Sequence, residues 1–553
     1  MQPLNNNSIS PWDSPSPKSL QLPNFPPEET KIPVPPEEET KDSKPKKSLS
    51  KKSKAKEIKI NTTRSRGELT LLKFLIEKNS WKEVFGGDGD ILWSGLAIPE
   101  ESLSIATEIR VNRLPGMQDL AHKKTTGYFL NKFREYFPDN YDFYPRTFLY
   151  PEEEAKFLKY FKKNKGNACF IAKPTSGSQG DGIILINKLT DLPNNRFSAP
   201  PELVIQEYID NPLIIDNKKF DLRLYVVIEN VKPLRAFLCD EGLARFATED
   251  YQKISKDNLR NYFMHLTNYS LNKMSPKFIY SEELTEIHLG SKRTLTSLWK
   301  SIEKEGFDKE NILESIEELI VNFLKSMQPF LFFDYKTAFG GKDNGKCFHV
   351  LGFDILLDTE LKPWLLEINN NPSLNISHED ENPPDKNKKK NLSFISPIDK
   401  YVKARVVEDT ILLMMLKSEE KNELKTGDFF RSLKLIFNEA EEGLSNEDLF
   451  KDILEIYGKL SGYRFRGSIT SSKFNKLAGI SGMTNEKFPK NSYDLLFTKV
   501  LRDQFDIKNM DFMSFLKAFE ELASKLIGVY NEEAKFAGVW ELKERIKREI
   551  DDL

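Results

Sequence analysis

The clearest structural signal in the chain is a pair of apolar runs, His349–Leu357 and Pro363–Ile368, on either side of a short polar segment. Both runs are too short and too interrupted for good helices. They therefore predict two paired, largely buried strands joined by a turn. Folding this hairpin about residue 360 sets Asp354 opposite Glu367 on the neighbouring strand.

Three oxygen-bearing side chains should then share one face of the hairpin, because strand alternation places Asn369 on the same side as Glu367. Two carboxylates that face each other in an apolar sheet repel unless a cation lies between them. The set Asp354, Glu367 and Asn369 offers only oxygen ligands, which suits a hard divalent ion such as the Mg²⁺ that holds nucleotide phosphates. A solvated sheet face is the alternative interpretation of this hairpin alone.

A glycine-rich segment lies between two further predicted strands, Ala168–Ala172 and Ile183–Ile186. Such a loop can place backbone N–H groups over phosphates, and Lys173 would add a positive charge. No GK[ST] sequence opens a helix here, so this is not a Walker loop. An ordinary turn is the alternative interpretation of its glycines, Gly177, Gly180 and Gly182.

The segment KFDLRLYVVIE predicts a strand with one charged and one apolar face. Alternation puts Lys219, Asp221 and Arg223 on one side and the intervening Phe and Leu residues on the other. Arg245, on the next predicted strand, could join the charged side. A solvated surface and a polar cleft both fit this pattern.

Two other stretches could contribute to such a cleft. The apolar run at 203–210 predicts a strand that ends in polar and aromatic residues able to line a pocket for a nucleotide base. The segment HLTNYS supplies Thr267 and Asn268 on a polar loop.

The two ends of the chain differ from the middle. Residues 1–63 hold 11 of the 30 prolines and a lysine-rich run, so we expect a disordered tail that cannot bury enough apolar surface to fold. Near the other end, helical periodicity predicts a separate small α-domain over 427–530 and a charged terminal helix over 531–553.

Composition narrows the class of protein. The chain has 553 residues with 82 basic and 84 acidic side chains, so no global field marks it as a nucleic-acid binder. Three scattered cysteines suit a reducing compartment. Five histidines form no zinc pattern. There is no signal core and no apolar run long enough for a bilayer, so we expect a soluble intracellular protein without membrane insertion.

Several motifs, taken in order, resemble the tubulin tyrosine ligase-like family: FIAKPTSGSQGDGI, QEYI, KFDLRLYV, HLTNYS, GSKRT, LGFDILLD and KPWLLEINNNPS. Four motifs of the chain are most similar to the elongating polyglutamylase branch of this family: RVNRLPGMQDL, FYPRTFL, SQGDGI and NNNPSLNISHEDE. The resemblance implies an α+β fold with an ATP-grasp core, in which two sheets clamp ATP. The implied core comprises an N-terminal part, a central subdomain and a C-terminal subdomain with the Mg²⁺ site: 64–150, 151–215 and 216–416.

The resemblance also implies roles for individual residues. ATP phosphates would be contacted by Lys123, Lys173, Gly177, Gly180, Gly182, Thr267 and Asn268. The adenine hinge would be Gln206, Glu207, Tyr208 and Ile209. The γ-phosphate and the reacting carboxyl groups would be surrounded by Lys219, Asp221, Arg223 and Arg245. Mg²⁺ would be bound by Asp354, Glu367 and Asn369, and the catalytic set would be Lys219, Arg223, Arg245 and Glu367. The family's usual Arg-Lys-Asp is His122-Lys123-Lys124 in this chain.

The implied activity is ATP-dependent ligation of free glutamate to glutamate side chains in the acidic C-terminal tails of tubulin, through an acylphosphate. A tubulin glycylase, a tyrosine ligase and a non-catalytic microtubule-binding protein are the alternatives. The implied partners are tubulin or microtubules, with no nucleic acid. We expect a monomer in the cytoplasm, on the cytoskeleton and at the cilium or basal body.

A second resemblance concerns the C-terminal region. SGYRFRGSITSSKFNKLAGISGM and the residues after it resemble the tubulin polymerization-promoting protein domain, a degenerate EF-hand-like helical unit. No DxDxDG loop is present, so we expect no Ca²⁺ site there. A generic helical domain is the alternative.

Overall fold

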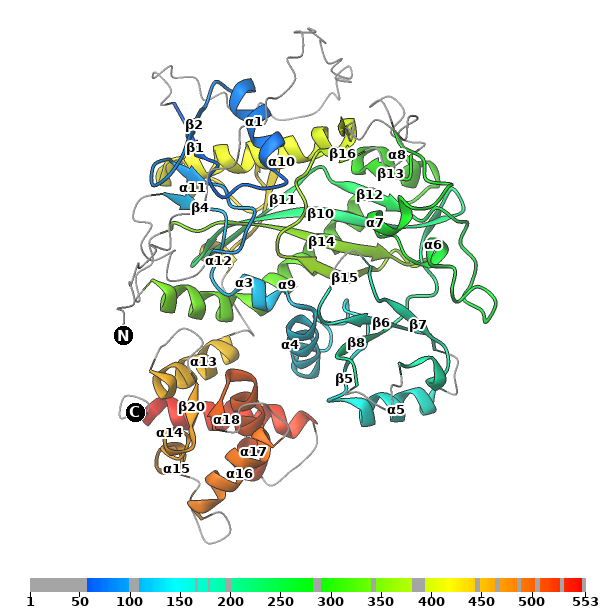
Figure 1. Cartoon of the computed structure of the whole chain (residues 1–553). Helices are drawn as coiled ribbons and strands as arrows, with labels where there is room; N and C mark the ends of the chain where they lie inside the picture. Colours follow the sequence, from blue (N-terminus) through cyan, green and yellow to red (C-terminus); the bar gives the residue numbers. More distant parts are fainter. Residues whose placement is uncertain are drawn as a thin grey trace, which may run out of the picture. The chain divides into compact units, whose positions relative to one another are not determined.

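The computed structural model has mixed helix and sheet architecture (Figure 1). It describes residues 57–98, 109–164, 168–177, 180–193, 200–281, 290–339, 345–379, 393–442, 448–462, 468–482, 484, 489–502, 508–527 and 532–549. Most of the expected tail therefore lies outside the described residues. Its predicted end at residue 63 is wrong, because Lys59–Asn61 forms strand β1 and pairs with two neighbouring strands.

A nine-stranded sheet forms the centre of the fold. Its longest strand, β10 (Lys218–Val231), pairs with strands on both sides because 14 consecutive residues stay extended. The other strands are β9 (Ile214–Ile215), β11 (Leu234–Cys239), β12 (Leu243–Phe246), β13 (Lys292–Thr294), β14 (His349–Leu357), β15 (Pro363–Asn369), β18 (Phe429–Phe430) and β19 (Leu433–Asn438).

Each face of this sheet buries a separate core, as the alternation along β10 predicts. Even-numbered residues such as Leu222 pack on the side of helix α9 (Lys309–Ala338). Tyr225 and Val227 pack on the opposite side, against α10 (Pro397–Met415). Figure 1 shows these two helices on opposite faces of the sheet.

The predicted hairpin is confirmed in position and register. Strands β14 and β15 are antiparallel, and Asp354 faces Glu367. All nine residues of β14 are buried because the strand lies inside the sheet, between β10 and β15.

A four-stranded antiparallel sheet lies beside the large one. Its order is β5-β8-β6-β7, and α5 (Glu154–Lys163) packs on it through Phe157 and Phe161. Its strands are β5 (Thr147–Tyr150), β6 (Phe170–Pro174), β7 (Ile184–Ile186) and β8 (Leu203–Glu207). Helix α4 (Lys123–Tyr136) packs against both β5 and α9.

A small parallel sheet, β2-β1-β3-β4, comes first in the chain. Its other strands are β2 (Lys82–Val84), β3 (Ile91–Leu92) and β4 (Arg110–Val111). The remaining elements of the core are α1 (Leu69–Lys78), α3 (Met117–Leu120), η1 (Leu189–Asp191), α6 (Tyr262–His265), α7 (Tyr269–Asn272), α8 (Leu295–Lys304), β16 (Ser377–Glu379), β17 (Ser393–Ile395), α11 (Ser418–Asn422) and α12 (Glu439–Glu442).

The predicted helical region at 427–530 differs from the structure at its beginning. Residues 429–438 form β18 and β19, and β19 pairs with β11 in the large sheet. The reason is visible in the side chains, since Leu433, Leu435 and Phe437 alternate and are buried.

The chain after residue 447 is mainly helical, although β20 (Ile469–Thr470) and β21 (Asn509–Met510) form a short antiparallel pair that the all-α expectation lacked. Its helices are α13 (Asp448–Ser461), α14 (Ser471–Phe474), α15 (Leu477–Ile480), α16 (Asn491–Leu501), α17 (Phe512–Ile527) and α18 (Glu532–Glu549). We call residues 448–549 the C-terminal helices. The resemblance of 427–530 to the tubulin polymerization-promoting protein domain stays a prediction.

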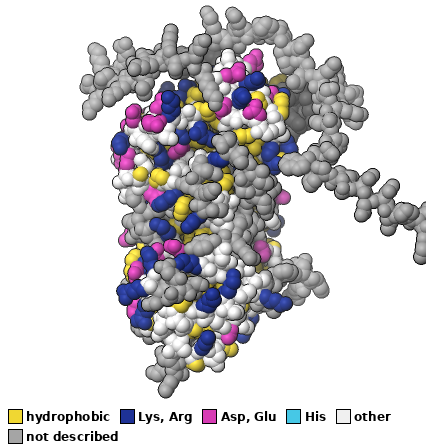
Figure 2. Space-filling model, turned by 90° about the vertical axis from the view of Figure 1, so that its left-hand side faces the viewer, with side chains coloured by type: hydrophobic (Ala, Val, Ile, Leu, Met, Phe, Trp, Pro, Cys, Tyr) yellow, Lys and Arg dark blue, Asp and Glu magenta, His cyan; other side chains and the backbone are white. Residues whose placement is uncertain are grey.

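The surface carries both signs of charge. On the face shown in Figure 2, Lys and Arg side chains are interspersed with Asp and Glu, in keeping with the nearly balanced composition. Among the described residues, no helix has the length and apolar character needed to cross a membrane.

Phe133→Ala should lower the free energy of unfolding by about 3–5 kcal/mol, because it leaves a cavity between α4 and the C-terminal helices. The Phe133 ring is fully buried and stacks on Phe450 with 4.4 Å between centroids. Leu495→Ala is the control, since its side chain is 70% exposed and the change should stay within about 0.5 kcal/mol. Urea unfolding measures both, and equal values for the two variants would contradict the prediction.

Candidate functional site

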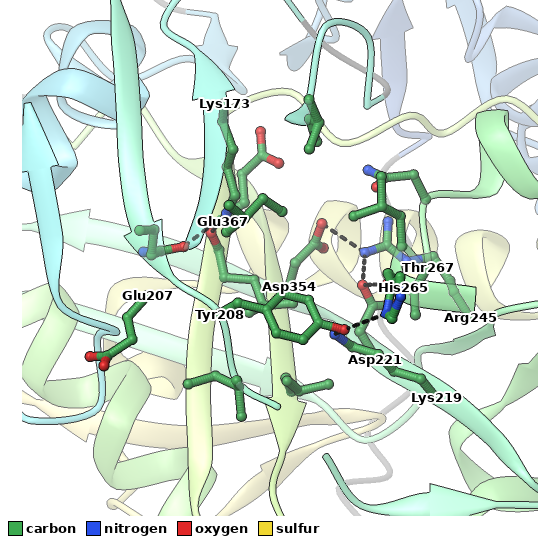
Figure 3. A pocket seen from close by; sticks show the side chains of 18 residues that line it. Lys173, Glu207, Tyr208, Lys219, Asp221, Arg245, His265, Thr267, Asp354 and Glu367 are labelled. Atoms are coloured by element: carbon green, nitrogen blue, oxygen red, sulfur yellow. Dashed lines mark hydrogen bonds and ion pairs between the residues drawn. The ribbon is translucent and has the colours of Figure 1, made fainter. Parts of the chain in front are cut away.

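The two sheets meet at a cleft that encloses about 640 Å³ of space, part of it open to solvent. Figure 3 shows its lining, with strands of both sheets contributing side chains. Most of the predicted site residues line it: Lys173, Gln206, Glu207, Tyr208, Ile209, Lys219, Asp221, Arg245, Thr267, Asn268, Asp354 and Glu367. The sequence therefore identified residues that the fold brings together from seven separate segments.

Lys219 and Asp221 of the charged face of β10 line this cleft, as one of the two interpretations predicted, whereas Arg223 is not among the lining residues. Asp221 lies opposite Arg245 in the register of β10 and β12. Arg245 donates to both oxygens of Asp221 at 2.7 and 2.5 Å, and the Thr267 hydroxyl donates at 2.7 Å. Asp221 thus orients a guanidinium that is almost completely buried.

A second charged row crosses three strands. Arg223, Asp354 and Glu367 are successive partners on β10, β14 and β15. Arg223 donates to Asp354 at 2.5 and 3.0 Å, and Arg245 lies 2.8 Å from the same carboxylate. Burial alone would raise the pKa of Asp354, but the two guanidinium groups hold it at about 2, so this side chain stays ionised.

Glu367 faces a different cation. Its carboxylate lies 3.4 Å from the ammonium of Lys123, which also donates to the Gly177 carbonyl at 2.9 Å. The amide of Asn369 donates to Asp354 at 3.4 Å. Both carboxylates therefore have cationic neighbours from the chain itself, so the predicted mutual repulsion is already compensated without a metal.

The oxygen set nevertheless fits a hard divalent ion. Each carboxylate oxygen has two lone pairs, so Asp354 can accept from arginine and bind a cation as well. Asp354, Glu367 and Asn369 come together from two adjacent strands, as predicted. No group of three or more His, Cys, Asp or Glu side chains suited to a metal occurs among the described residues, so the amide would have to complete this set.

Two buried lysines make the cavity suitable for a polyanion. Lys173 donates to Gln206 at 2.9 Å and to the Leu366 carbonyl at 3.1 Å. Lys219 donates to the Tyr208 hydroxyl at 3.1 Å. Burial lowers the pKa of Lys173 to about 8 and that of Lys219 to about 7, because the neighbouring carboxylates only partly offset the loss of water. The negative charge of a phosphate chain bound in the cavity would offset the remaining cost of burying the two ammonium groups.

The glycine-rich loop approaches the cavity at Asn268, although none of its three glycines is among the lining residues. All three of its predicted glycines have positive φ: +122° at Gly177, +87° at Gly180 and +68° at Gly182. A Cβ at Gly180 would lie 3.3 Å from the Asn268 side chain, so the loop reaches the polar segment on the far side of the cleft. A side chain at Gly180 would therefore be strained in its backbone and crowded by Asn268.

The Glu207 side chain differs in direction from the other predicted carboxylates. Its carboxylate accepts from the Tyr160 hydroxyl at 3.3 Å and points away from the other labelled carboxylates in Figure 3. A nucleotide base in the cavity could therefore contact the backbone of Glu207 more readily than its side chain.

His265 is a lining residue that sequence reasoning missed. Its Nδ1 lies 3.1 Å from the Tyr208 hydroxyl, and burial lowers its pKa to about 4, so the ring is neutral. The sequence motif HLTNYS could have indicated this residue, because His265 lies two residues before Thr267 in it.

These features define an α+β protein in which a cleft, lined by both basic and acidic side chains, lies between two antiparallel sheets. Residues 103–390, just over half of the chain, match the model of the tubulin-tyrosine ligase family. The chain belongs to this family, which confirms the resemblance of its motifs.

Curated relatives agree with this assignment. A probable beta-tubulin polyglutamylase of Tetrahymena thermophila is 37% identical over 341 residues, which cover 61% of this chain and 26% of the relative. Tubulin polyglutamylase TTLL11 of Mus musculus is 37% identical over 373 residues, covering 65% of this chain and 49% of the relative. Tubulin polyglutamylase TTLL13 of Homo sapiens is 33% identical over 384 residues, covering 68% and 42%. The chain spans about half or less of the length of these relatives.

Proposed function

We propose that this protein is an ATP-dependent ligase that adds glutamate to glutamate side chains of tubulin C-terminal tails. The observation that carries the proposal is the arrangement of Lys173, Lys219, Arg223 and Arg245 around the Asp354–Glu367 pair. The relatives' names, all tubulin polyglutamylases, supply the acceptor and the amino acid.

In this proposal the two sheets form an ATP-grasp clamp. The four-stranded antiparallel sheet contributes Lys173 and the glycine-rich loop, and the large sheet contributes the carboxylates and guanidinium groups. Gln206–Ile209 would contact adenine, and Lys123, Thr267 and Asn268 would contact phosphates. Asp354, Glu367 and Asn369 would hold Mg²⁺, which when bound would neutralise charge on the phosphates.

The chemistry requires an activated carboxylate, because hydroxide is a poor leaving group. Phosphorylation by ATP would convert the acceptor carboxylate into an acylphosphate, and the amino group of free glutamate would then displace phosphate. Arg223 and Arg245 would stabilise negative charge on the transferred group, since both guanidinium groups are already oriented by Asp221 and Asp354. No side-chain nucleophile is needed.

The partners follow from this assignment. We propose that the protein acts on tubulin or microtubules in the cytoplasm, on the cytoskeleton and at the cilium or basal body, as a monomer. Acidic tails would be attracted to the Lys and Arg side chains in and around the cleft, so association should weaken as salt rises.

Mass spectrometry of tubulin after incubation with the protein and MgATP tests the proposal. We expect mass additions of glutamate and none of glycine or tyrosine when each amino acid is supplied alone. Omitting ATP is the control. Addition of glycine or tyrosine instead would assign a different ligase of the same family. Microtubule binding with no ligation at all would indicate a non-catalytic protein.

A further inference from the structure

The C-terminal helices, which lie outside the residues matched to the family, contact the helix that carries Lys123. Glu520 on α17 is 5% exposed, and its carboxylate accepts from the Tyr136 hydroxyl at 2.5 Å. The same carboxylate lies 3.1 Å from the ammonium of Lys132. Both partners belong to α4, so one buried acidic side chain fixes two successive turns of that helix.

This polar contact lies at the edge of a shared apolar core. Phe450 on α13 stacks on Phe133 of α4 and lies 5.7 Å from Tyr136 between ring centroids. Figure 1 shows α4 between the C-terminal helices and the four-stranded antiparallel sheet β5-β8-β6-β7. The helix is therefore enclosed on both sides.

The opposite side of α4 supports the cleft. Lys123, Gly127 and Asn131 follow each other at intervals of four residues, as do Tyr128, Lys132 and Tyr136 on the side of the C-terminal helices. At about 100° per residue the two stripes lie on nearly opposite sides of the helix. Rotation or translation of α4 would therefore move both stripes together.

Two connections run from the first stripe into the cleft. Lys123 donates to the Gly177 carbonyl and lies 3.4 Å from Glu367. Asn131 donates to the Thr147 carbonyl at 2.9 Å. The Thr147 hydroxyl in turn accepts from Gln206 at 3.1 Å, and Gln206 accepts from Lys173 at 2.9 Å.

We propose that Glu520 is a positioning residue for the nucleotide site and acts through α4 on Lys123 and the glycine-rich loop. This inference rests on the proposed function, because it assumes that the cleft binds MgATP. It gives the C-terminal helices a role in the cleft itself. Their contact with α4 would set how tightly the phosphates are held.

The test compares two carboxylates on the same helix. Glu520→Gln keeps an acceptor for Tyr136 but removes the charge that faces Lys132. Glu521→Gln is the matched control, because Glu521 is 30% exposed and its partner at 2.7 Å, Lys499, is itself 63% exposed. In the full-length chain, we expect Glu520→Gln to weaken MgATP binding about three- to tenfold, measured by calorimetry, and Glu521→Gln to leave it unchanged.

A double-mutant cycle separates positioning from general stability. In a Lys123→Met background, Glu520→Gln should weaken MgATP binding by less than it does in the wild type. The reason is that Lys123, through which Glu520 is proposed to act, is already absent. The melting temperature of each variant is measured alongside. Tyr136→Phe, which removes one hydroxyl, provides a second and milder perturbation if Glu520→Gln fails to fold.

The outcomes are distinct. A lower melting temperature with unchanged MgATP affinity in Glu520→Gln, or in Tyr136→Phe where the first variant does not fold, overturns the inference and leaves a purely structural contact. If Glu520→Gln lowers the MgATP affinity equally in the wild-type and Lys123→Met backgrounds, Glu520 does not act through Lys123. A wild-type chain that binds no MgATP contradicts the proposed function itself.

Discussion

Glu367→Gln should reduce ligation by about 10²- to 10³-fold while the chain still folds. Glu367 is the carboxylate in the cleft that faces Lys123, whereas both oxygens of Asp354 are engaged by arginine. Glutamine keeps the size of the side chain but removes the charge that Mg²⁺ would need. Initial rates of glutamate incorporation into tubulin at saturating MgATP measure the effect.

Glu360→Gln is the matched control for this experiment. Glu360 is exposed in the turn of the same hairpin, so the same chemical change there should leave the rate unaltered. Circular dichroism of both variants checks that the fold is retained. A Glu367→Gln variant with the wild-type rate would remove Glu367 from the metal and catalytic sets.

The central part of the site could be predicted because strands impose a strict register. Alternation with a period of two fixes which residues share a face, and a short turn fixes which residues face each other. These two rules placed Asp354 opposite Glu367 and put Lys219, Asp221 and Arg223 on one face. In the structure Lys219 and Asp221 line the cavity, and Arg223 lies opposite Asp354. The assignment of that face to a cleft required the structure, because a charged strand face is equally compatible with solvent.

Charge compensation could not be read from the sequence. The hairpin alone showed two carboxylates and predicted a cation between them. In the structure Arg223 and Arg245 come from β10 and β12 to compensate Asp354. Which side chains neutralise a buried charge depends on the packing of strands distant in the chain.

The C-terminal boundary was wrong for a related reason. The segment 427–438 is short and precedes a strongly helical region. Local periodicity therefore assigned this segment to the helical domain. Their strands exist because β11 offers an edge to pair with. A truncation designed from the sequence at Leu416 would remove β19 from the large sheet, and its failure to fold would say nothing about the C-terminal helices.

Lys219→Met should stabilise the protein at pH 6 by about 1–3 kcal/mol and weaken MgATP binding about 10- to 100-fold. Lys219 is almost completely buried, and its ammonium must leave water whenever it is protonated. Methionine fills a similar volume without that cost. Urea unfolding and calorimetry of the same preparations give the two quantities, and they should change in opposite senses.

The pH dependence of the stability difference identifies its cause. Burial lowers the pKa of Lys219 to about 7 in the folded chain, against 10.5 in the unfolded chain. Between these values the unfolded chain binds one more proton, so the free energy of unfolding of the wild type should rise with pH across that window. A methionine side chain does not titrate, so the advantage of Lys219→Met should be largest at pH 6 and shrink towards pH 10. An advantage that stays constant over this range would show that packing, and not the buried charge, distinguishes the two proteins.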